Sequence, residues 1–492
     1  MPSSRGADDS ANAIAALADR AAAPDRRDRP AYYLDGRHCT HGELHALAAR
    51  MAGALAGRGV RAGTRVLLCA PDGIGWIATF LAIGRLGAVA ILVNPGLAEP
   101  ELQALAESVR PLLTVGRGVS GPTIGLDELE HEARRAPEAP AAQVDLTTPL
   151  YVQFTSGTTG APKGAVHCHG DLTHHFEAVG RRMLRIEPDD VTFSVSKLFF
   201  AYGFGNSLIY PLYSGSAAVL LVAKPGPAQV AEAADRYGVT VLHAVPSALA
   251  HLVAEADAAA FQRVRVVVSA GERLSTTLGE RGRALFGVPV LDELGSTEVG
   301  GAWCANTLSD NMPGTVGRPL HGYRIEVRDR DGHPVPDDTE GRLHVSGPTL
   351  FTEYLDRPEA TAAALKAGWL ATRDTGIRRS DGRFVHTGRV DDIEIVGGIN
   401  IAPAEIEDLL TGHPGVREAA VAAFPDPRGA TRLRAFVVTA TQDRTALADE
   451  LTALVRSHLA PFKVPRTITF VDALPRTPTG KLRRHVVRTG DW

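Results

Sequence analysis

Short apolar runs rich in β-branched residues alternate along this chain with longer segments whose apolar residues recur at helical spacing. The first group comprises a strand at residues 65–70, a helix around 77–86 and a strand at 88–93 that ends at Asn94-Pro95. The alternation returns later, with strands at 217–222, 239–243 and 264–269 and a helix at 228–237. Such alternation is typical of parallel strands covered by helices. The pattern therefore predicts an α/β fold with parallel or mixed sheets.

A second pattern begins after Gly388. Strands are expected at 393–396, 419–424, 434–439 and 467–471, and helices at 404–410 and 446–458. A unit of roughly 100 residues can hold its own core, and 492 residues exceed what one core usually supports. We place the boundary at Arg389, which predicts a large domain over residues 1–388 and a small α+β domain over residues 389–492.

Composition narrows the classes of partner. Hydrophobic residues make up 44% of the chain and charged residues 22%, with a formal net charge of -4, so nothing electrostatic favours nucleic acid. The cysteines Cys39, Cys69, Cys168 and Cys304 form no CxxC pair, which argues against a disulfide framework or a structural zinc site. No run of about 18 apolar residues occurs. We expect a cytoplasmic protein with no membrane partner.

One loop combines glycines, hydroxyl side chains and a lysine: Thr155-Ser156-Gly157-Thr158-Thr159-Gly160-Ala161-Pro162-Lys163-Gly164. It follows an apolar run at 150–154, so it should leave the end of a strand, where backbone N–H groups can converge on an anion. The Walker loop does not fit, because Gly164 stands where that loop has its magnesium-binding hydroxyl. A dinucleotide fingerprint does not fit, because Leu208 stands where Gly203-Phe204-Gly205 needs a third glycine. A polyphosphate is the expected ligand, with a glycine-rich surface turn as the plain alternative.

Two further polar segments, residues 269–272 and 292–298, also follow apolar, strand-like runs. Ligands of α/β sheets gather at the carboxyl ends of the strands. We therefore expect both segments and the phosphate loop to meet at one crevice.

The motifs downstream of the loop resemble, in their order, those of the adenylate-forming enzymes, the superfamily of acyl-CoA synthetases, nonribosomal adenylation domains and luciferases. They are Ser269-Ala270-Gly271-Glu272, Gly295-Ser296-Thr297-Glu298, Gly388-Arg389-Val390-Asp391-Asp392, Gly397-Gly398-Ile399-Asn400-Ile401-Ala402-Pro403-Ala404-Glu405-Ile406-Glu407 and Pro475-Arg476-Thr477-Pro478-Thr479-Gly480-Lys481. The resemblance implies an enzyme that joins a carboxylate to AMP from ATP, releases pyrophosphate, and passes the acyl group to a thiol. ATP, Mg²⁺ and CoA are the implied cofactors and substrates.

The family assigns roles to individual residues. Its phosphate loop, here Thr155 to Gly160 with Lys163, holds the β- and γ-phosphates. Glu298 would bind Mg²⁺, which prefers hard oxygen ligands; the structural alternative is a capped helix start after Ser296-Thr297. The other residues implied to bind ATP are Ala270, Gly271, Glu272, Glu293, Gly295, Ser296, Thr297, Asp374 and Arg389, with Leu294 where many relatives have tyrosine beside adenine.

At one position the chain departs from the family. The usual Thr-Gly-Asp appears as Thr372-Arg373-Asp374. Asp374 is expected to accept hydrogen bonds from both ribose hydroxyls, while Arg373 replaces a glycine that would permit a tight turn. Arg389 would support ribose or phosphate through its several donors.

The C-terminal motifs imply a moving domain. Lys481 would bridge the substrate carboxylate and the α-phosphate, neutralising charge where two anions meet. In the family the small domain then rotates about a hinge, here Arg389 and Asp391, and Gly397-Gly398 lines the tunnel through which the thiol enters. Without these motifs, a lysine near the C-terminus would be read as a solvated surface charge.

Residues 197–206 resemble the corresponding stretch of benzoate-CoA ligases, which points to an aromatic acid. The family lines its ring pocket with Ala201 and Tyr202 and with the glycine Gly295; an aromatic core helix is the alternative. After Glu298 the benzoate enzymes carry bulkier side chains, whereas this chain reads Val299-Gly300-Gly301-Ala302-Trp303. Gly301 is therefore expected in a roomier slot that admits benzoate, a hydroxy- or aminobenzoate, or a longer arylalkenoate.

Several alternatives stay open at this point. An aryl acid–acyl carrier protein ligase would differ only in its thiol partner, and a catalytically silent nucleotide-binding homologue would keep the fold. The histidines His167, His169, His174 and His175 with Cys168 invite a transition-metal site, but their spacing is imperfect. We predict an AMP-forming aryl acid–CoA ligase.

Overall fold

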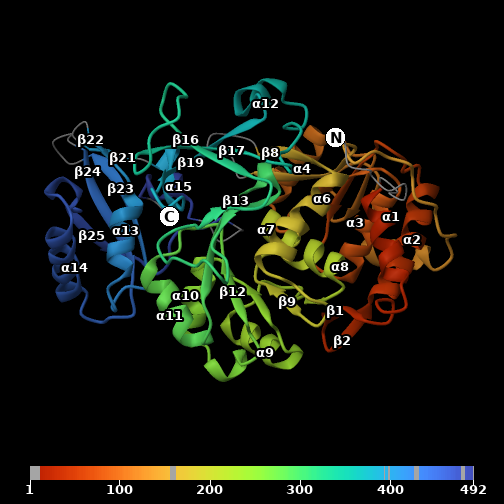
Figure 1. Ribbon diagram of the computed structural model, residues 1–492, viewed down its shortest axis with the longest axis horizontal. Coiled ribbons are helices and arrows are strands. Elements are labelled where there is room, and N and C mark those ends of the chain that lie inside the picture. Colours follow the sequence, from red (N-terminus) through yellow and green to blue (C-terminus); the bar gives the residue numbers. More distant parts are fainter. Residues whose placement is uncertain are drawn as a thin grey trace.

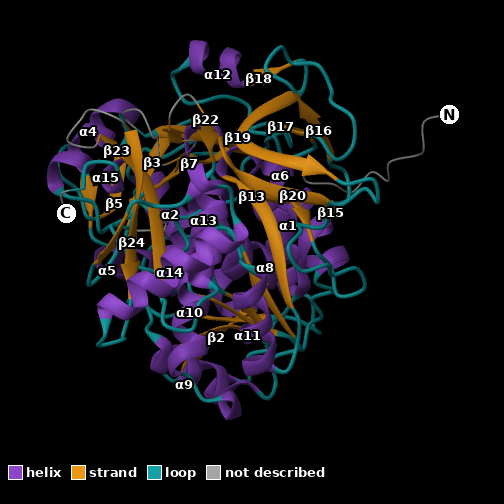
Figure 2. Ribbon diagram, turned by 90° about the vertical axis from the view of Figure 1, so that its left-hand side faces the viewer, coloured by secondary structure: helices purple, strands orange, loops and turns teal. Residues whose placement is uncertain are grey.

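The computed structural model describes residues 12–155, 162–392, 394–396, 399–425, 431–477, 482–490 and 492. It has a large N-terminal domain, drawn from red to green in Figure 1, and a small C-terminal domain in blue at its side. The view turned by 90° shows helices α13 (Pro403–Thr411) and α14 (Arg444–His458) of the small domain in front of the large one (Figure 2).

The first sheet of the large domain has six strands in the order β6-β5-β3-β4-β7-β8 and is parallel except for its last pair. The strands are β3 (Arg65–Cys69), β4 (Val89–Leu92), β5 (Leu113–Gly116), β6 (Thr123–Ile124), β7 (Pro149–Thr155) and β8 (Lys163–Cys168). Parallel neighbours such as β3 and β4 are buried on both faces, which explains their continuous apolar runs.

The second sheet has nine strands in the order β15-β14-β13-β12-β11-β9-β10-β1-β2. Pairing is parallel from β13 to β1 and antiparallel at both edges. The strands are β1 (Pro30–Leu34), β2 (Arg37–Thr40), β9 (Val191–Ser194), β10 (Ala217–Val219), β11 (Val241–His243), β12 (Val266–Ser269), β13 (Val290–Ser296), β14 (Gly301–Ala305) and β15 (Arg318–Pro319).

The helices of the large domain cover these sheets, and the sequence marks several of them clearly. Helix α2 starts at a capping box made by Thr40 and Glu43. Helix α3 is apolar on every side, and residues 75–84 are all buried, as expected of a helix enclosed by its neighbours. The helices are α1 (Ala13–Ala22), α2 (His41–Gly57), α3 (Ile74–Arg85), α4 (Glu99–Val109), α5 (Leu126–Ala133), α6 (His169–His175), η1 (Phe176–Met183), α7 (Ala201–Phe204), η2 (Gly205–Ile209), α8 (Tyr210–Ser214), α9 (Pro227–Tyr237), α10 (Pro246–Glu255), η3 (Ala258–Phe261), α11 (Thr276–Phe286), η4 (Thr297–Val299) and α12 (Pro358–Ala364).

A third, antiparallel sheet was not anticipated from the sequence. Its strands are β16 (Arg324–Arg328), β17 (Glu340–Ser346), β18 (Leu365–Lys366), β19 (Trp369–Arg378) and β20 (Phe384–Arg389). The register of β19 against β17 shifts between Ala371 and Thr375, so three residues of β19 face a single residue of β17. Irregularities of this kind bend a strand and redirect its side chains, and Asp374 lies within this one, opposite Arg389 at the end of β20.

The small domain has its own core. Its strands are β21 (Glu394–Val396), β22 (Ile399–Ile401), β23 (Glu418–Pro425), β24 (Thr431–Val438) and β25 (Thr467–Phe470), and its helices are η5 (Val390–Asp392), α13, α14, η6 (Pro461–Lys463) and α15 (Arg484–Val487). Apolar residues of α13, α14 and β24, such as Ile406, Leu451 and Ala435, form a buried cluster. Among the described residues, no helix is long and apolar enough to cross a membrane.

Most of the predicted elements are confirmed with ends within a few residues. The helix expected at 228–237 is α9, and the strands expected at 264–269 and 467–471 are β12 and β25. The passage at 207–223 runs from helix into strand, through η2, α8 and β10. Helices and strands alternate around largely parallel sheets, so the predicted α/β class is correct.

Candidate active site

A cleft of about 1660 Å³ lies where the sheets of the large domain end and the small domain begins. Its walls include residues at the ends of three separate strands: Thr155 ends β7, Gly271 follows β12 and Glu298 follows β13. The convergence predicted from topology is therefore present. The antiparallel sheet adds Asp374 and Arg389, and the small domain adds residues such as Asp408.

The described ends of the phosphate loop line this cleft. Thr155 ends β7 and pairs with Lys163, which starts β8, and both residues line the cleft. The loop residues Ser156, Gly157, Thr158, Thr159 and Gly160 lie outside the described residues. The two described ends of the loop agree with the predicted place for a polyphosphate.

Lys163, Tyr354 and Glu298 form a contiguous group at the cleft. The hydroxyl of Tyr354 donates to Oε1 of Glu298 at 2.7 Å, and Nζ of Lys163 lies 5.2 Å from the centre of the Tyr354 ring. Burial, followed by the neighbouring Glu298 charge, raises the pKa of Tyr354, so the phenol stays protonated and acts as the donor. The remaining carboxylate oxygen of Glu298 is a hard ligand that fits Mg²⁺.

The capping alternative for Glu298 is not what the structure shows. Glu298 lies in the short 3₁₀ helix η4. The side chain of Ser296, the N-cap residue of this helix, makes no capping hydrogen bond among the described residues. Glu298 is instead held by Tyr354, which comes from a segment 56 residues further along the chain.

The segment after β12 shapes the side where adenine is expected. Gly271 has φ of 86°, which glycine adopts without strain. Glu272 accepts hydrogen bonds from the backbone N–H of Ser247 at 3.1 Å and its Oγ at 3.3 Å. Ala270 is buried beneath this turn, and Leu294 lines the cleft where relatives have tyrosine.

Glu293 lies in β13 and also lines the cleft, although its side chain is buried. It is 6% exposed, while its neighbours Leu294 and Gly295 are more open. Because its carboxyl is enclosed, Glu293 is expected to meet adenine through its backbone. Burial raises the pKa of its carboxyl to about 8, which keeps it protonated at neutral pH.

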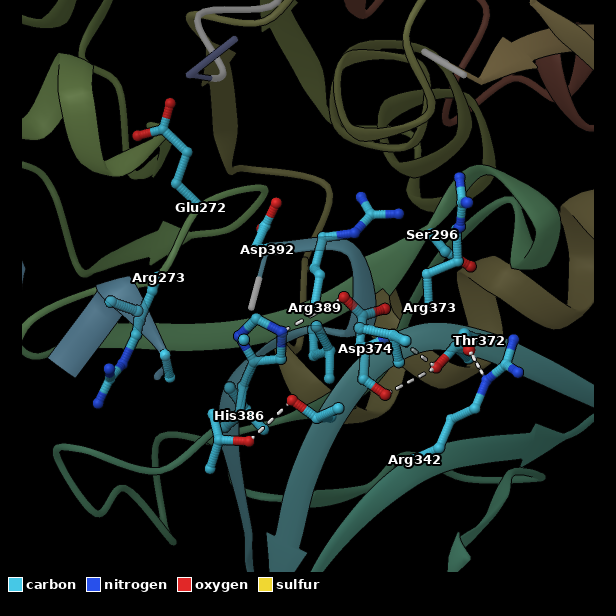
Figure 3. Close-up of a pocket in the computed structure, with 18 of the residues that line it drawn as sticks. Glu272, Arg273, Ser296, Arg342, Thr372, Arg373, Asp374, His386, Arg389 and Asp392 are labelled. Atoms are coloured by element: carbon cyan, nitrogen blue, oxygen red, sulfur yellow. Dashed lines mark hydrogen bonds and ion pairs between the residues drawn. The ribbon is translucent and has the colours of Figure 1, made fainter. Parts of the chain in front are cut away.

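Asp374 and Arg389 lie opposite each other where β19 pairs with β20. Figure 3 shows both side chains at the cleft, with Arg373 projecting on the other side of Asp374 in this view. His386 Nε2 lies 3.3 Å from Oδ1 of Asp374, and the Asp374 N–H donates to Thr372 Oγ1 at 3.2 Å. These contacts fix the carboxylate that is expected to bind ribose.

The backbone at residue 373 does not need the tight turn that the family's glycine would permit. Arg373 lies within the continuous strand β19 and is absent from the described residues with positive φ. A glycine is therefore not required by the backbone. The bend near Asp374 comes from the shifted register against β17, which an arginine tolerates.

Among the described residues, ion pairs of Arg476 and Arg273 join the small domain to the adenine side of the cleft. Arg476 contacts Glu272 of the large domain at 3.1 Å and Glu418 of its own domain at 2.6 Å. Arg273 contacts Asp408 of α13 at 2.5 Å. Burial raises the pKa of Asp408 to about 6, against the lowering effect of Arg273.

Other predicted residues lie outside the described part of the chain. They are Lys481, Gly397 and Gly398, and the side chain of Asp391 is likewise not described. Thr477 and Leu482, the described residues on either side of the Lys481 segment, both line the cleft. The chain therefore enters and leaves this segment at the site where Lys481 was expected.

The residues predicted to form the ring slot come from adjoining elements. Ala201 and Tyr202 are half-buried in α7, and Gly295 and Gly301 come from the paired strands β13 and β14. Tyr202 donates its hydroxyl to the carbonyl of Val268 at 2.9 Å, which fixes its ring as a wall. The alternative interpretation, an aromatic core helix, holds for Phe204 of the same helix, which packs against Phe80.

The histidines after the phosphate loop have separate structural roles. His167 is fully buried, with Nδ1 at 3.0 Å from Asp171 and Nε2 at 2.8 Å from the carbonyl of Thr297. His169 starts α6, and His175 bonds Tyr210. The cluster of possible metal ligands found among the described residues is elsewhere, at the exposed Asp329, Asp331 and His333.

Sequence reasoning missed residues that approach the site from distant segments. Tyr354, Arg273 and Arg476 carried no motif-based role, although the last lies inside a quoted motif. A tyrosine or arginine in an irregular segment gives no local signal of the partner that it will meet across the fold. Only the three-dimensional arrangement reveals these contacts.

Comparison with known proteins agrees with this geometry. The family model described as AMP-binding enzyme matches residues 19–355, and the model for the AMP-binding enzyme C-terminal domain matches residues 405–481. The chain therefore belongs to the AMP-binding enzymes, the adenylate-forming superfamily.

Particular relatives bind or activate aromatic acids, according to their names. The chain is 38% identical over 487 residues to a p-hydroxybenzoic acid–AMP ligase of Mycobacterium tuberculosis, and the aligned region covers 97% of this chain and 68% of the relative. It is 36% identical over 504 residues to a benzoate–CoA ligase of Thauera aromatica, covering 97% and 96%. The solved structure of an anthranilate CoA ligase in complex with anthranoyl-AMP is similar with a TM-score of 0.92 at 30% identity, covering 97% of each chain.

Proposed function

We propose that this chain activates an aromatic carboxylic acid with ATP and transfers the acyl group to the thiol of CoA. The observation that carries the proposal is the junction at Gly295, which lines the nucleotide cleft while its strand β13 pairs with β14 at the ring slot. An acid whose ring lies in the slot would thus present its carboxylate to the nucleotide. The aromatic substrates named for the relatives support the same class.

The first half-reaction forms the acyl adenylate. A carboxylate oxygen attacks the α-phosphorus, the new P–O bond forms, and the bond to the β-phosphate breaks to release pyrophosphate. Lys163 and the backbone of the loop beginning at Thr155 would hold the departing phosphates, and Asp374 would orient the ribose. Lys481 would reduce the repulsion between the two reacting anions.

Mg²⁺ fits the oxygen-rich wall around Glu298, which would hold it. When bound, the ion neutralises phosphate charge. Tyr354 would keep the Glu298 carboxylate in position, because its hydroxyl occupies one carboxylate oxygen and leaves the other for the ion.

The second half-reaction makes the thioester. The thiol of CoA loses its proton, its sulfur attacks the carbonyl carbon, and AMP leaves with the electron pair of the broken C–O bond. We propose that the small domain, from Arg389 to the C-terminus, turns about Arg389 and Asp391 between the two steps, so that Lys481 withdraws and Gly397-Gly398 faces the thiol path. The separate core of the small domain supports its movement as a unit.

Such a rotation must break contacts between the domains. The pairs Arg273–Asp408 and Arg476–Glu272 hold the present arrangement. Both lie at the partly exposed edge of the cleft, where ion pairs contribute little to stability, so they can select one arrangement without locking it. A cytoplasmic location, where ATP and CoA are available, is part of the proposal.

A panel of benzoates assayed for acid-dependent pyrophosphate release tests the first half-reaction. Thioester formation is then followed with CoA and, in a parallel reaction, with a pantetheinylated acyl carrier protein. The proposal expects aryl-CoA, AMP and pyrophosphate in equal amounts. Transfer to the carrier protein but not to CoA would identify an aryl acid–acyl carrier protein ligase. Pyrophosphate release at background level with every acid would identify a catalytically silent homologue.

A further inference from the structure

A buried imidazole, that of His175, lies against Gly301, one of the residues predicted to form the ring slot. A Cβ placed on Gly301 would stand 1.9 Å from Cε1, 2.5 Å from Nε2 and 2.9 Å from Nδ1 of His175. The His175 ring therefore occupies the space that a larger side chain at 301 would need. A glycine at 301 brings this ring next to the slot.

Exposure gives the slot a direction. Gly295 is exposed to the cleft, Gly301 is half-buried, and His175 is 3% exposed. Because the carboxylate of the acid must stay at the cleft to meet ATP, the opposite end of the ring points inward. On a benzoate, the group nearest to His175 is then the substituent at ring position 4.

The His175 ring is held in place and uncharged. Its Nε2 lies 3.0 Å from the hydroxyl of Tyr210, and the two rings stack at 5.6 Å. Burial, followed by the nearby His167, lowers the pKa of His175 to about 4. Gly205 allows the pair to approach, since a Cβ there would lie 3.0 Å from the His175 Nε2.

The second nitrogen of His175 lacks a partner. Nδ1 is buried and makes no hydrogen bond within the described part of the chain. A buried polar atom without a partner is unfavourable and calls for an explanation, such as a ligand that completes it. Nδ1 donates in one tautomer of neutral imidazole and accepts in the other, and a hydroxyl group can meet either need.

We infer that His175 is a specificity-determining residue that recognises a hydroxyl at position 4 of the benzoate ring, with Tyr210 as its positioning partner. The inference rests on the proposed function, because it requires an aromatic acid in this slot. Unsubstituted benzoate would leave Nδ1 without a partner, and a methyl or chloro group could not supply one. Sites built to bond a substrate hydroxyl discriminate against the analogue that lacks it.

The experiment compares kcat/KM for 4-hydroxybenzoate and benzoate, measured by acid-dependent pyrophosphate release. The wild-type ratio is expected to favour the hydroxylated acid by about 10-fold or more, a size consistent with one buried hydrogen bond. His175→Leu removes the recognising nitrogen and should lower this ratio by about 10-fold. Tyr210→Phe removes one oxygen with little change in shape, and should also lower the ratio.

His174→Leu is the matched control, because His174 is the exposed neighbour on the same helix; its ratio should equal that of the wild type. A wild-type preference for benzoate, or an unchanged ratio in both His175→Leu and Tyr210→Phe, would overturn the inference while leaving the proposed function intact. A preference for 3-hydroxybenzoate over the 4-isomer would overturn the assigned position. If no acid supported pyrophosphate release, the proposed function and the inference would both be refuted. Should His175→Leu not fold, the nearly isosteric Tyr210→Phe decides.

Discussion

The nucleotide cleft and the ring slot share β13, yet they are built in opposite ways. The cleft is lined by charged, partly exposed groups such as Asp374, Glu298 and Arg389, drawn from both domains. The slot lies against the buried imidazole of His175, which burial keeps neutral. Glu293, a buried residue of β13 near Tyr202, is likewise kept protonated by burial. Charge is placed where phosphates must be bound and released, and withheld where an uncharged ring must enter.

This difference predicts how each region responds to change. In the cleft, removing one charge should alter nucleotide handling and leave ring selection unaffected. In the slot, substitutions should alter which acid is chosen or how stability depends on pH. A cleft variant that changed the choice of acid would contradict this division.

The largest effect is expected at Lys481, which we propose acts in the cleft chemistry although it comes from the small domain. Lys481→Ala should slow adenylate formation by about 10²–10³-fold or more, because a positioned positive charge is lost. Thioester formation from presynthesised aryl adenylate should stay largely intact. Asp391→Pro, which restricts the hinge, should do the reverse. Single-turnover assays of each step make the measurement, and equal loss of both steps in each variant would refute the rotating domain.

Individual strands and site residues show how much of the fold and of the site could be predicted from the sequence. The α/β alternation gave the parallel sheets, because strands buried on both faces read as unbroken apolar runs, as in β12 (Val266–Ser269). The antiparallel strands were missed, and β16 shows why: its arginines at both ends hide a short alternation of buried Ile325 and Val327. Motifs located Glu298, Asp374 and Lys163 because their residue types and spacing are local.

The rest depends on contacts that no local pattern carries. Tyr354 reaches Glu298, and Arg476 reaches Glu272, across 56 and 204 positions respectively. His175 was noticed as one of several clustered histidines, but its role depends on the glycine at 301, far along the chain. The bend at Asp374 arises from register between strands, which the order of residues alone does not determine.

The second prediction concerns the ribose side of the cleft. Asp374→Asn keeps the size of the side chain but removes a charged acceptor, so KM for ATP should rise by about 10–100-fold, the usual value of a hydrogen bond to a charged group. KM for the acid should change little. Pyrophosphate exchange at varied ATP, and separately at varied acid, measures the two KM values. Asp381→Asn, at the exposed tip between β19 and β20, is the control, and an equal rise there would argue against a ribose contact.

The third prediction tests the neutral character of the slot through stability. Burial raises the pKa of Glu293 to about 8 from an ordinary value of 4.5. The folded protein therefore keeps a proton that the unfolded chain releases between these values. The stabilising contribution is complete below about pH 4.5 and is lost as pH rises toward 8. Between pH 6 and 8 the wild type should lose about 2 kcal/mol of unfolding free energy relative to Glu293→Gln.

Urea unfolding at pH 6, 7 and 8 makes this comparison. Glutamine stays neutral across the range, so the variant should lack this part of the pH dependence. Glu255→Gln, at a half-exposed position on α10, should follow the wild type. Parallel curves for wild type and Glu293→Gln would show that the Glu293 carboxyl is charged in the folded protein, contrary to the contrast between slot and cleft.

The smallest effect is expected at Arg373, the arginine that stands where relatives have glycine. It lines the cleft beside Asp374, and its charge lowers the pKa of Tyr354 slightly, against the larger effect of burial. Arg373→Gln should raise KM for ATP by about 3–10-fold, and Arg373→Lys should recover most of the loss, because a partly exposed charge is screened by water and salt. The effect should shrink further as salt is added. Glutamine is the better test than glycine, because glycine inside β19 would also weaken the strand. If the Gln and Lys variants behaved alike, Arg373 would act through packing and not through its charge. Asp374 would then be the last residue of this strand that contributes charge to the cleft.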